Sequence, residues 1–199
     1  MPEMIRILCE GLAIVLFTLI CTRFLCKNMK KRDFRFVLWL PYVLTGCGSA
    51  MLFLLGGLSP WTFCGIAFLF VLLYASVQDH STHEADDILS VMMLMLAVTN
   101  ISEATVLLQL LGAAIVCGAH MLIALCGKKR MGIGGADIKL STAAALLLGF
   151  YKGVIGFMLG LLIAVVAQLI ITHRKKEQRT QPFALLPYLS VGLWIGYLI

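Results

Sequence analysis

Two aspartates stand out among the ten acidic residues of this 199-residue chain because each lies at the end of an apolar run. Asp79 follows the run 61–78, and Asp137 precedes the run 138–150. A carboxylate at the centre of a bilayer costs about 2.5–3.5 kcal/mol on insertion scales, so acids in membrane segments are rare and usually functional. Two facing carboxylates cannot both ionise cheaply, and such a pair can supply a general acid and a general base. Asp79 and Asp137 are therefore candidate functional residues of a type that could do such chemistry.

Asp137 ends the glycine-rich stretch MGIGGAD, in which Gly134, Gly135 and Ala136 directly precede the acid. Glycine permits unusual dihedral angles and a close approach of another backbone. These three residues are therefore candidate substrate-binding positions for an extended peptide. The alternative interpretation is a turn in which Asp137 is the N-cap of a helix beginning at Ile138, and the sequence leaves both open.

Glu84, Asp86 and Asp87 form a second acidic group, in the polar stretch 79–87, which contains no Lys or Arg. One interpretation is a solvated loop in which Asp86 or Asp87 caps a helix that starts at Ile88. The other is a docking surface for a basic segment of a substrate, because opposite charges steer encounter. The neighbouring pattern HSTHE matches neither HExxH nor HxxEH, so we expect no metal site and no cofactor.

The composition places these acids in a membrane protein. The chain is 61% apolar and 13% charged, whereas soluble domains average about 45–50% and about 25%. The net charge of +6 comes from basic residues in short clusters between apolar runs, which is typical of membrane orientation signals rather than of nucleic-acid binding. We expect one integral membrane domain over residues 1–199 with the lipid bilayer as its partner.

Eight apolar runs predict an all-α, polytopic helical bundle with six to eight transmembrane helices. The range is open because the short runs 88–99 and 138–150 either cross the bilayer or dip in and return. Basic clusters at 27–35, 128–130 and 174–179 contain twelve of the 16 Lys and Arg residues. An even number of crossings separates them, so all three lie on one face, which the positive-inside rule assigns to the cytoplasm. Asp79 and Asp137 then lie on that face as well.

The short runs also predict where a site lies. A helix of 12 or 13 residues is about 18–20 Å long at about 1.5 Å per residue, shorter than a hydrocarbon core of about 30 Å. We therefore expect both aspartates in one water-accessible pocket just inside the cytoplasmic boundary. A break is expected at Tyr151-Lys152-Gly153, and Gly153, Gly156 and Gly160 are expected to serve helix packing.

The stretch GGADIKLSTAAALLLG resembles the motif of the type IV prepilin peptidase family, the GxGD-type intramembrane aspartic proteases. The family pattern Gly-x-Gly-Asp, a hydrophobic residue, Lys and Leu falls on residues 134–140, with Ala136 in place of the second glycine. Asp79, at the end of YASVQD, matches the family's first catalytic aspartate. The family's Ile-Pro-Asn reads Ala-Asp-Asp here, and PF followed by PYL at 182–189 is similar to its C-terminal ending. The resemblance covers Tyr74 to Gly192.

This resemblance implies an intramembrane aspartic endopeptidase in which Asp79 and Asp137 are catalytic. Its expected substrates are prepilin-like proteins with a short basic leader and an apolar helix, cut at the cytoplasmic face of a prokaryotic inner membrane during pilus biogenesis or protein secretion. Gly134, Gly135 and Ala136 would contact the peptide, and the loop of Glu84, Asp86 and Asp87 would suit the leader. The chain lacks the CxxC pairs of members that also methylate, which predicts a peptidase-only form, and a homo-oligomer stays open.

Two other functions remain alternatives. A proton-coupled membrane transporter would also use membrane aspartates and short helices, although no strong internal repeat is visible. A catalytically inactive membrane assembly protein of the same fold is the other alternative.

Overall fold

The computed structural model describes residues 2–101, 105–126, 134–175 and 184–199. These residues form helices and no strands, which confirms the predicted all-α bundle. In chain order the helices are α1 (Pro2–Lys31), α2 (Trp39–Gly56), α3 (Pro60–Thr82), α4 (Asp87–Thr99), α5 (Val106–Cys126), α6 (Gly135–Leu148), α7 (Phe150–Lys175) and α8 (Leu186–Leu198).

The described part of the chain has the surface of a multi-pass membrane protein. Five of its helices, α1, α2, α3, α5 and α7, are long and apolar enough to cross a membrane. The other three have only 13 or 14 residues. Large apolar side chains lie on the outside, and Leu54, Leu107 and Leu125 are each about four-fifths exposed. A water-soluble monomer rarely exposes so much apolar surface, whereas lipid tails solvate it.

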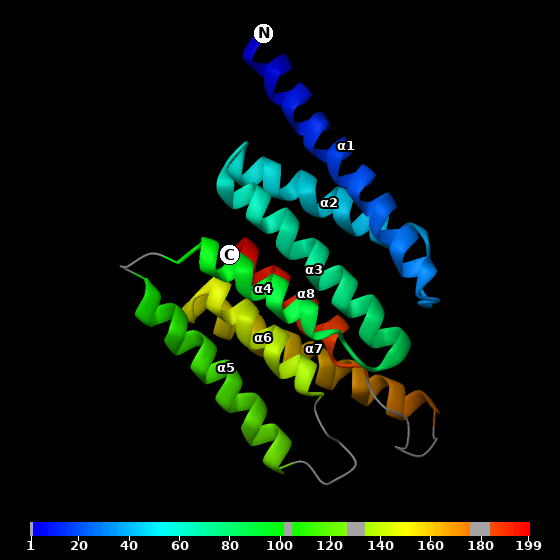
Figure 1. Ribbon diagram of the computed structural model, residues 1–199, viewed down its shortest axis with the longest axis vertical. Coiled ribbons are helices and arrows are strands. Elements are labelled where there is room, and N and C mark those ends of the chain that lie inside the picture. The colour runs from blue at the N-terminus through cyan, green and yellow to red at the C-terminus, as the bar shows by residue number, and fades with distance from the viewer. Residues whose placement is uncertain (1, 102–104, 127–133, 176–183) are drawn as a thin grey trace.

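The two helices that carry the aspartates, α3 and α6, pack against two common neighbours. In Figure 1, α1 and α5 lie on opposite flanks, with α3, α4, α8, α6 and α7 between them. Helix α3 packs against α2, α4 and α8, and α6 packs against α4, α5, α7 and α8. Phe68, Met93, Leu140 and Leu193 bring α3, α4, α6 and α8 into one buried core. The shared neighbours α4 and α8 therefore fix α3 and α6 relative to each other.

Small residues let α7 and α8 approach closely. A Cβ atom added at Gly192 would lie 2.2 Å from the nitrogen of Gly160, and one at Gly196 would lie 3.0 Å from the Cα of Gly156. A Cβ at Gly153 would lie 3.0 Å from the Cα of Ala145 in α6. The prediction that the glycines of α7 serve packing is therefore confirmed, and their partners are α6 and α8.

Paired hydroxyl groups join α1 to α2. Thr18 and Ser49 are hydrogen-bonded at 3.0 Å, and Thr22 and Thr45 at 2.7 Å, all four being buried. Such bonds connect membrane helices where apolar packing alone gives little driving force, because lipid tails are equally apolar.

The bundle has two ends with different chemistry. At one, which we call the aspartate end, α3 finishes near Asp79, α6 begins near Asp137, and Arg32 after α1 contacts Asp86 before α4. At the other, the cavity end, α3, α7 and α5 begin and α4, α6 and α8 finish. The short helices α4 and α6 thus run from one end to the other instead of dipping in and returning. Helices α1, α5 and α7, which precede the three basic clusters, all finish at the aspartate end.

The structure corrects one predicted break. The chain turns at Gly149, and Tyr151, Lys152 and Gly153 lie in the first turns of α7. Gly149 has φ +81°, a conformation that glycine adopts without steric cost, and its N–H donates to the carbonyl of Ala145. Gly149 is therefore the single residue that separates α6 from α7.

Candidate active site

Asp79 lies in the last turn of α3, and its side chain is bound to the start of α8. The residue is only 5% exposed, and its Oδ2 accepts a hydrogen bond of 2.9 Å from the backbone N–H of Leu186. Leu186 is the first residue of α8, where backbone N–H groups have no partner within the helix and carry partial positive charge. The carboxylate is therefore stabilised by a helix terminus that lies 107 residues further along the chain.

Asp137 lies in the first turn of α6, which is not among the five long apolar helices. The residue is 7% exposed. Burial raises the pKa of Asp137, and the negative charge of Asp79 raises it further, against the opposing effect of the Gly134 backbone, to about 7. Asp137 therefore keeps its proton to a much higher pH than an ordinary aspartic acid.

The structure thus brings the two predicted acids to one end of the bundle, close enough for one charge to act on the other. A carboxylate held by an N–H group and a neighbouring acid that retains its proton are the two components of acid–base catalysis. Neither group requires a metal ion for this role.

The glycine-rich approach to Asp137 leaves the site open. Helix α6 begins at Gly135 with Gly134 as its N-cap, so Asp137 is not the N-cap of a helix starting at Ile138. Gly134 and Gly135 are exposed and Ala136 is partly buried. A Cβ added at Gly135 would meet no described atom within 4 Å, and one at Gly134 would lie 3.4 Å from Oδ2 of Asp137. Among the described residues, packing therefore gives no reason for glycine at 135, and nothing described covers the backbone there.

The predicted acidic loop lies at the same end but is not free of cations. Arg32 forms an ion pair with Asp86, and Lys139 forms one with Asp87 at 2.8 Å. Asp86 occupies the N-cap position of α4, but its side chain makes no capping hydrogen bond. Hydrogen bonds from Arg32 and then Gln78 lower its pKa. The sequence near the loop gave no sign of these two cations, because Arg32 lies 54 positions from Asp86 and Lys139 lies 52 positions from Asp87. Glu84 is exposed.

His120, which belongs to none of the predicted sites, is fully buried in α5 and contacts α6 close to Asp137. Its Nδ1 lies 3.3 Å from Oγ of Ser141 and 3.2 Å from the carbonyl of Val116. Ser141 in turn donates a hydrogen bond of 2.6 Å to the carbonyl of Asp137. These contacts tie α5 to the first turn of α6. The available signal was a histidine inside the predominantly apolar run 104–126.

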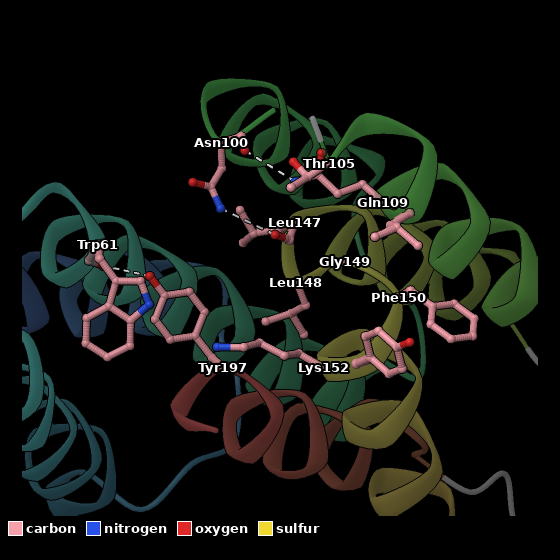
Figure 2. Close-up of a pocket in the computed structure, with 12 residues that line it drawn as sticks. Trp61, Asn100, Thr105, Gln109, Leu147, Leu148, Gly149, Phe150, Lys152 and Tyr197 are labelled. Carbon is pink, nitrogen blue, oxygen red and sulfur yellow. Dashed lines mark hydrogen bonds between the residues drawn. The ribbon is translucent and has the colours of Figure 1, made fainter. Parts of the chain in front are cut away.

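Among the residues with described positions, no three side chains of the metal-ligating types come together near His80 and His83 or elsewhere. A cavity of about 550 Å³ lies at the cavity end, lined by residues such as Trp61, Asn100 and Lys152 (Figure 2). It contains neither aspartate.

Fold and site define a multi-pass helical membrane protein with two buried, interacting aspartates at one end of the bundle. Residues 66–172, more than half of the chain, match the model of the type IV leader peptidase family. The chain therefore belongs to this family, as the motif around Asp137 indicated. The matched region extends from α3 into α7 and includes both Asp79 and Asp137. No curated protein and no solved structure matches the chain.

Proposed function

We propose that this protein is an aspartic leader peptidase that cleaves the short basic leader of prepilin-like proteins with Asp79 and Asp137. One observation carries the proposal: a buried acid whose pKa is raised to about 7 interacts with a second buried acid, beside an exposed glycine backbone. Membership of a leader peptidase family supports the reaction class.

In the proposed mechanism the two acids have different roles, which their different surroundings support. Asp79, which accepts the Leu186 N–H, carries the negative charge and removes a proton from water. The resulting hydroxide adds to the scissile carbonyl carbon while protonated Asp137 donates to the carbonyl oxygen. Asp79 then donates its new proton to the amide nitrogen while Asp137 takes a proton back from a hydroxyl of the tetrahedral diol, so that the carbonyl re-forms, the C–N bond breaks and the amine leaves. The products are a leader with a new carboxyl terminus and a mature protein with a new amino terminus.

The surroundings of the aspartates suit such a substrate. The open backbone at Gly134, Gly135 and Ala136 can lie against the extended segment around the scissile bond. Glu84, Asp86 and Asp87 offer negative charge to the basic leader, which then displaces Arg32 and Lys139 from their carboxylates. Exposed ion pairs contribute only about 0–1 kcal/mol each, so this exchange costs little.

The proposed orientation places the aspartate end at the cytoplasmic face of a prokaryotic inner membrane. Its support is that the helices before all three basic clusters finish at this end. In a cysteine-free background, Glu84→Cys should react with a membrane-impermeant thiol reagent only from the cytoplasmic side. Tyr151→Cys, an exposed position at the cavity end, is the matched control and should react only from the opposite side. The reverse labelling pattern would overturn this orientation.

Co-expression with a prepilin-like protein tests the reaction itself. Mass spectrometry of the substrate should show loss of the basic leader at one peptide bond when this protein is present. An unprocessed substrate together with proton-driven solute uptake would favour a transporter. An unprocessed substrate without uptake would favour an inactive member of the family.

A further inference from the structure

The cavity at the cavity end is built from the termini of six helices. It lies where α3, α5 and α7 begin and where α4, α6 and α8 finish, and its volume is about 550 Å³. A phosphate-bearing lipid head group with its glycerol unit fits a space of this size. Because Asp79 and Asp137 lie at the opposite end, the cavity is separate from the proposed active site.

Lys152 supplies a positive charge to the cavity. Its side chain extends across the cavity toward Tyr197 (Figure 2). The described residues include no carboxylate paired with it, whereas Arg6 is bound to Glu10 at 2.8 Å. In the proposed orientation, Lys152 also lies on the face that the positive-inside rule disfavours for cations.

The start of α7 adds a second attraction for an anion. Phe150, Tyr151 and Lys152 form the first turn of this 26-residue helix and line the cavity. Backbone N–H groups in a first turn have no partner within the helix and carry partial positive charge. No acidic side chain occupies this turn to use them. The ammonium of Lys152 and these N–H groups therefore favour the same anionic ligand.

The remaining walls combine apolar surface with an unused acceptor. Trp61 and Tyr197 stack with ring centroids 5.2 Å apart, and the Tyr197 hydroxyl donates to the carbonyl of Trp61. Leu148 lies between them and α7 (Figure 2). Gln109 is 5% exposed, and its Oε1 has no hydrogen-bond partner in the described part of the chain. Aromatic rings of this kind are enriched where membrane proteins meet lipid head groups.

We propose that this cavity binds the head group of an anionic glycerophospholipid. The phosphate lies between the ammonium of Lys152 and the first turn of α7. The glycerol unit and the start of the acyl chains contact Leu148, Trp61 and Tyr197, and a hydroxyl of the head group reaches toward Gln109. The site is independent of leader cleavage and stands or falls separately from the proposed peptidase activity.

Lipid-dependent stability of the purified full-length protein tests this proposal. The delipidated protein in a neutral detergent is titrated with phosphatidylglycerol, phosphatidylcholine or inorganic phosphate, and thermal unfolding is measured. Phosphatidylglycerol should raise the Tm of the wild type more than phosphatidylcholine does. Lys152→Gln should weaken the apparent affinity for phosphatidylglycerol about tenfold, the effect of losing a charge-assisted hydrogen bond. Lys31→Gln removes an exposed lysine from the other end and should bind like the wild type.

A second variant tests the cavity without changing charge. Leu148→Trp fills part of the space and should also weaken binding of phosphatidylglycerol. Equal effects of the two lipids on the wild type, or wild-type affinity in Lys152→Gln or Leu148→Trp, would overturn the proposal. A Tm increase by inorganic phosphate equal to that by phosphatidylglycerol would show a free-anion site and would overturn it as well.

Discussion

The carboxylate of Asp79 binds the backbone N–H of Leu186, which ties the last turn of α3 to the first turn of α8. The bond is buried and 2.9 Å long, so a catalytic candidate is also a structural contact. Loss of activity in an Asp79 variant is therefore informative only when folding is measured separately.

Two Asp79 variants separate these roles. Asp79→Asn keeps an oxygen that can accept the Leu186 N–H, so its thermal stability in detergent should stay close to the wild type. Asp79→Leu leaves that buried N–H without a partner and should destabilise the protein by about 1–3 kcal/mol. Equal Tm values for the two variants would show that this hydrogen bond contributes nothing to stability.

The raised pKa of Asp137 predicts how cleavage depends on pH. Burial, and then the Asp79 charge, raise it to about 7, so the catalytic proton is retained below this pH and lost as the pH rises above it. The value of kcat/KM, which reports the pKa of the free enzyme, should therefore fall roughly 50-fold between pH 7 and pH 9. The substrate for this measurement should have arginine and no lysine in its leader, so that its own charge stays constant over this range. A kcat/KM that stays constant to pH 9 would contradict the assignment of the proton to Asp137.

The ion pair between Arg32 and Asp86 predicts competition with the leader. Arg32→Gln frees Asp86 and should lower the KM for a basic leader by up to about fivefold, with a smaller change in kcat. Lys31→Gln removes the same charge from the neighbouring residue without breaking a described ion pair. The difference between the two variants should disappear at high salt, because screening weakens exposed charges. If both variants change KM equally at low salt, Asp86 does not receive the leader.

The chain of hydrogen bonds from His120 through Ser141 predicts a positioning role for this histidine. With its proton on Nδ1, the ring donates toward Ser141, which holds the carbonyl of Asp137. His120→Leu should lower kcat by about tenfold and leave KM nearly unchanged, because the leader binds elsewhere. His120→Asn places an N–H near the Nδ1 position and should restore much of the rate. If His120→Asn has the same Tm as the wild type but does not restore kcat, His120 contributes only to packing.

The sequence was sufficient to predict the helical architecture and to single out two aspartates that the structure buries near each other. The apolar runs are much longer than the few residues by which the predicted ends of a helix can be wrong, so the helices themselves are easy to predict. Carboxylates beside such runs are rare, so the two aspartates stand out. The apolar stretch around Gly149 concealed where α6 ends, because the chain turns at a single glycine with φ +81° and not at a polar break. The partners of Asp79, Asp86 and Asp87 were also not predictable. Leu186, Arg32 and Lys139 lie 52 to 107 positions away, and only the packing of the helices brings them near.

The most direct test of the central claim is single-turnover cleavage of a prepilin-like substrate by purified wild type, Asp79→Asn and Asp137→Asn. Both substitutions preserve size and remove only the carboxyl chemistry. We expect each variant to insert and to unfold at a Tm near the wild type, yet to cleave at least about 10³-fold more slowly, as is typical when an acid–base group is lost. Wild-type cleavage by either well-folded variant would remove that aspartate from the reaction and contradict the proposed pair.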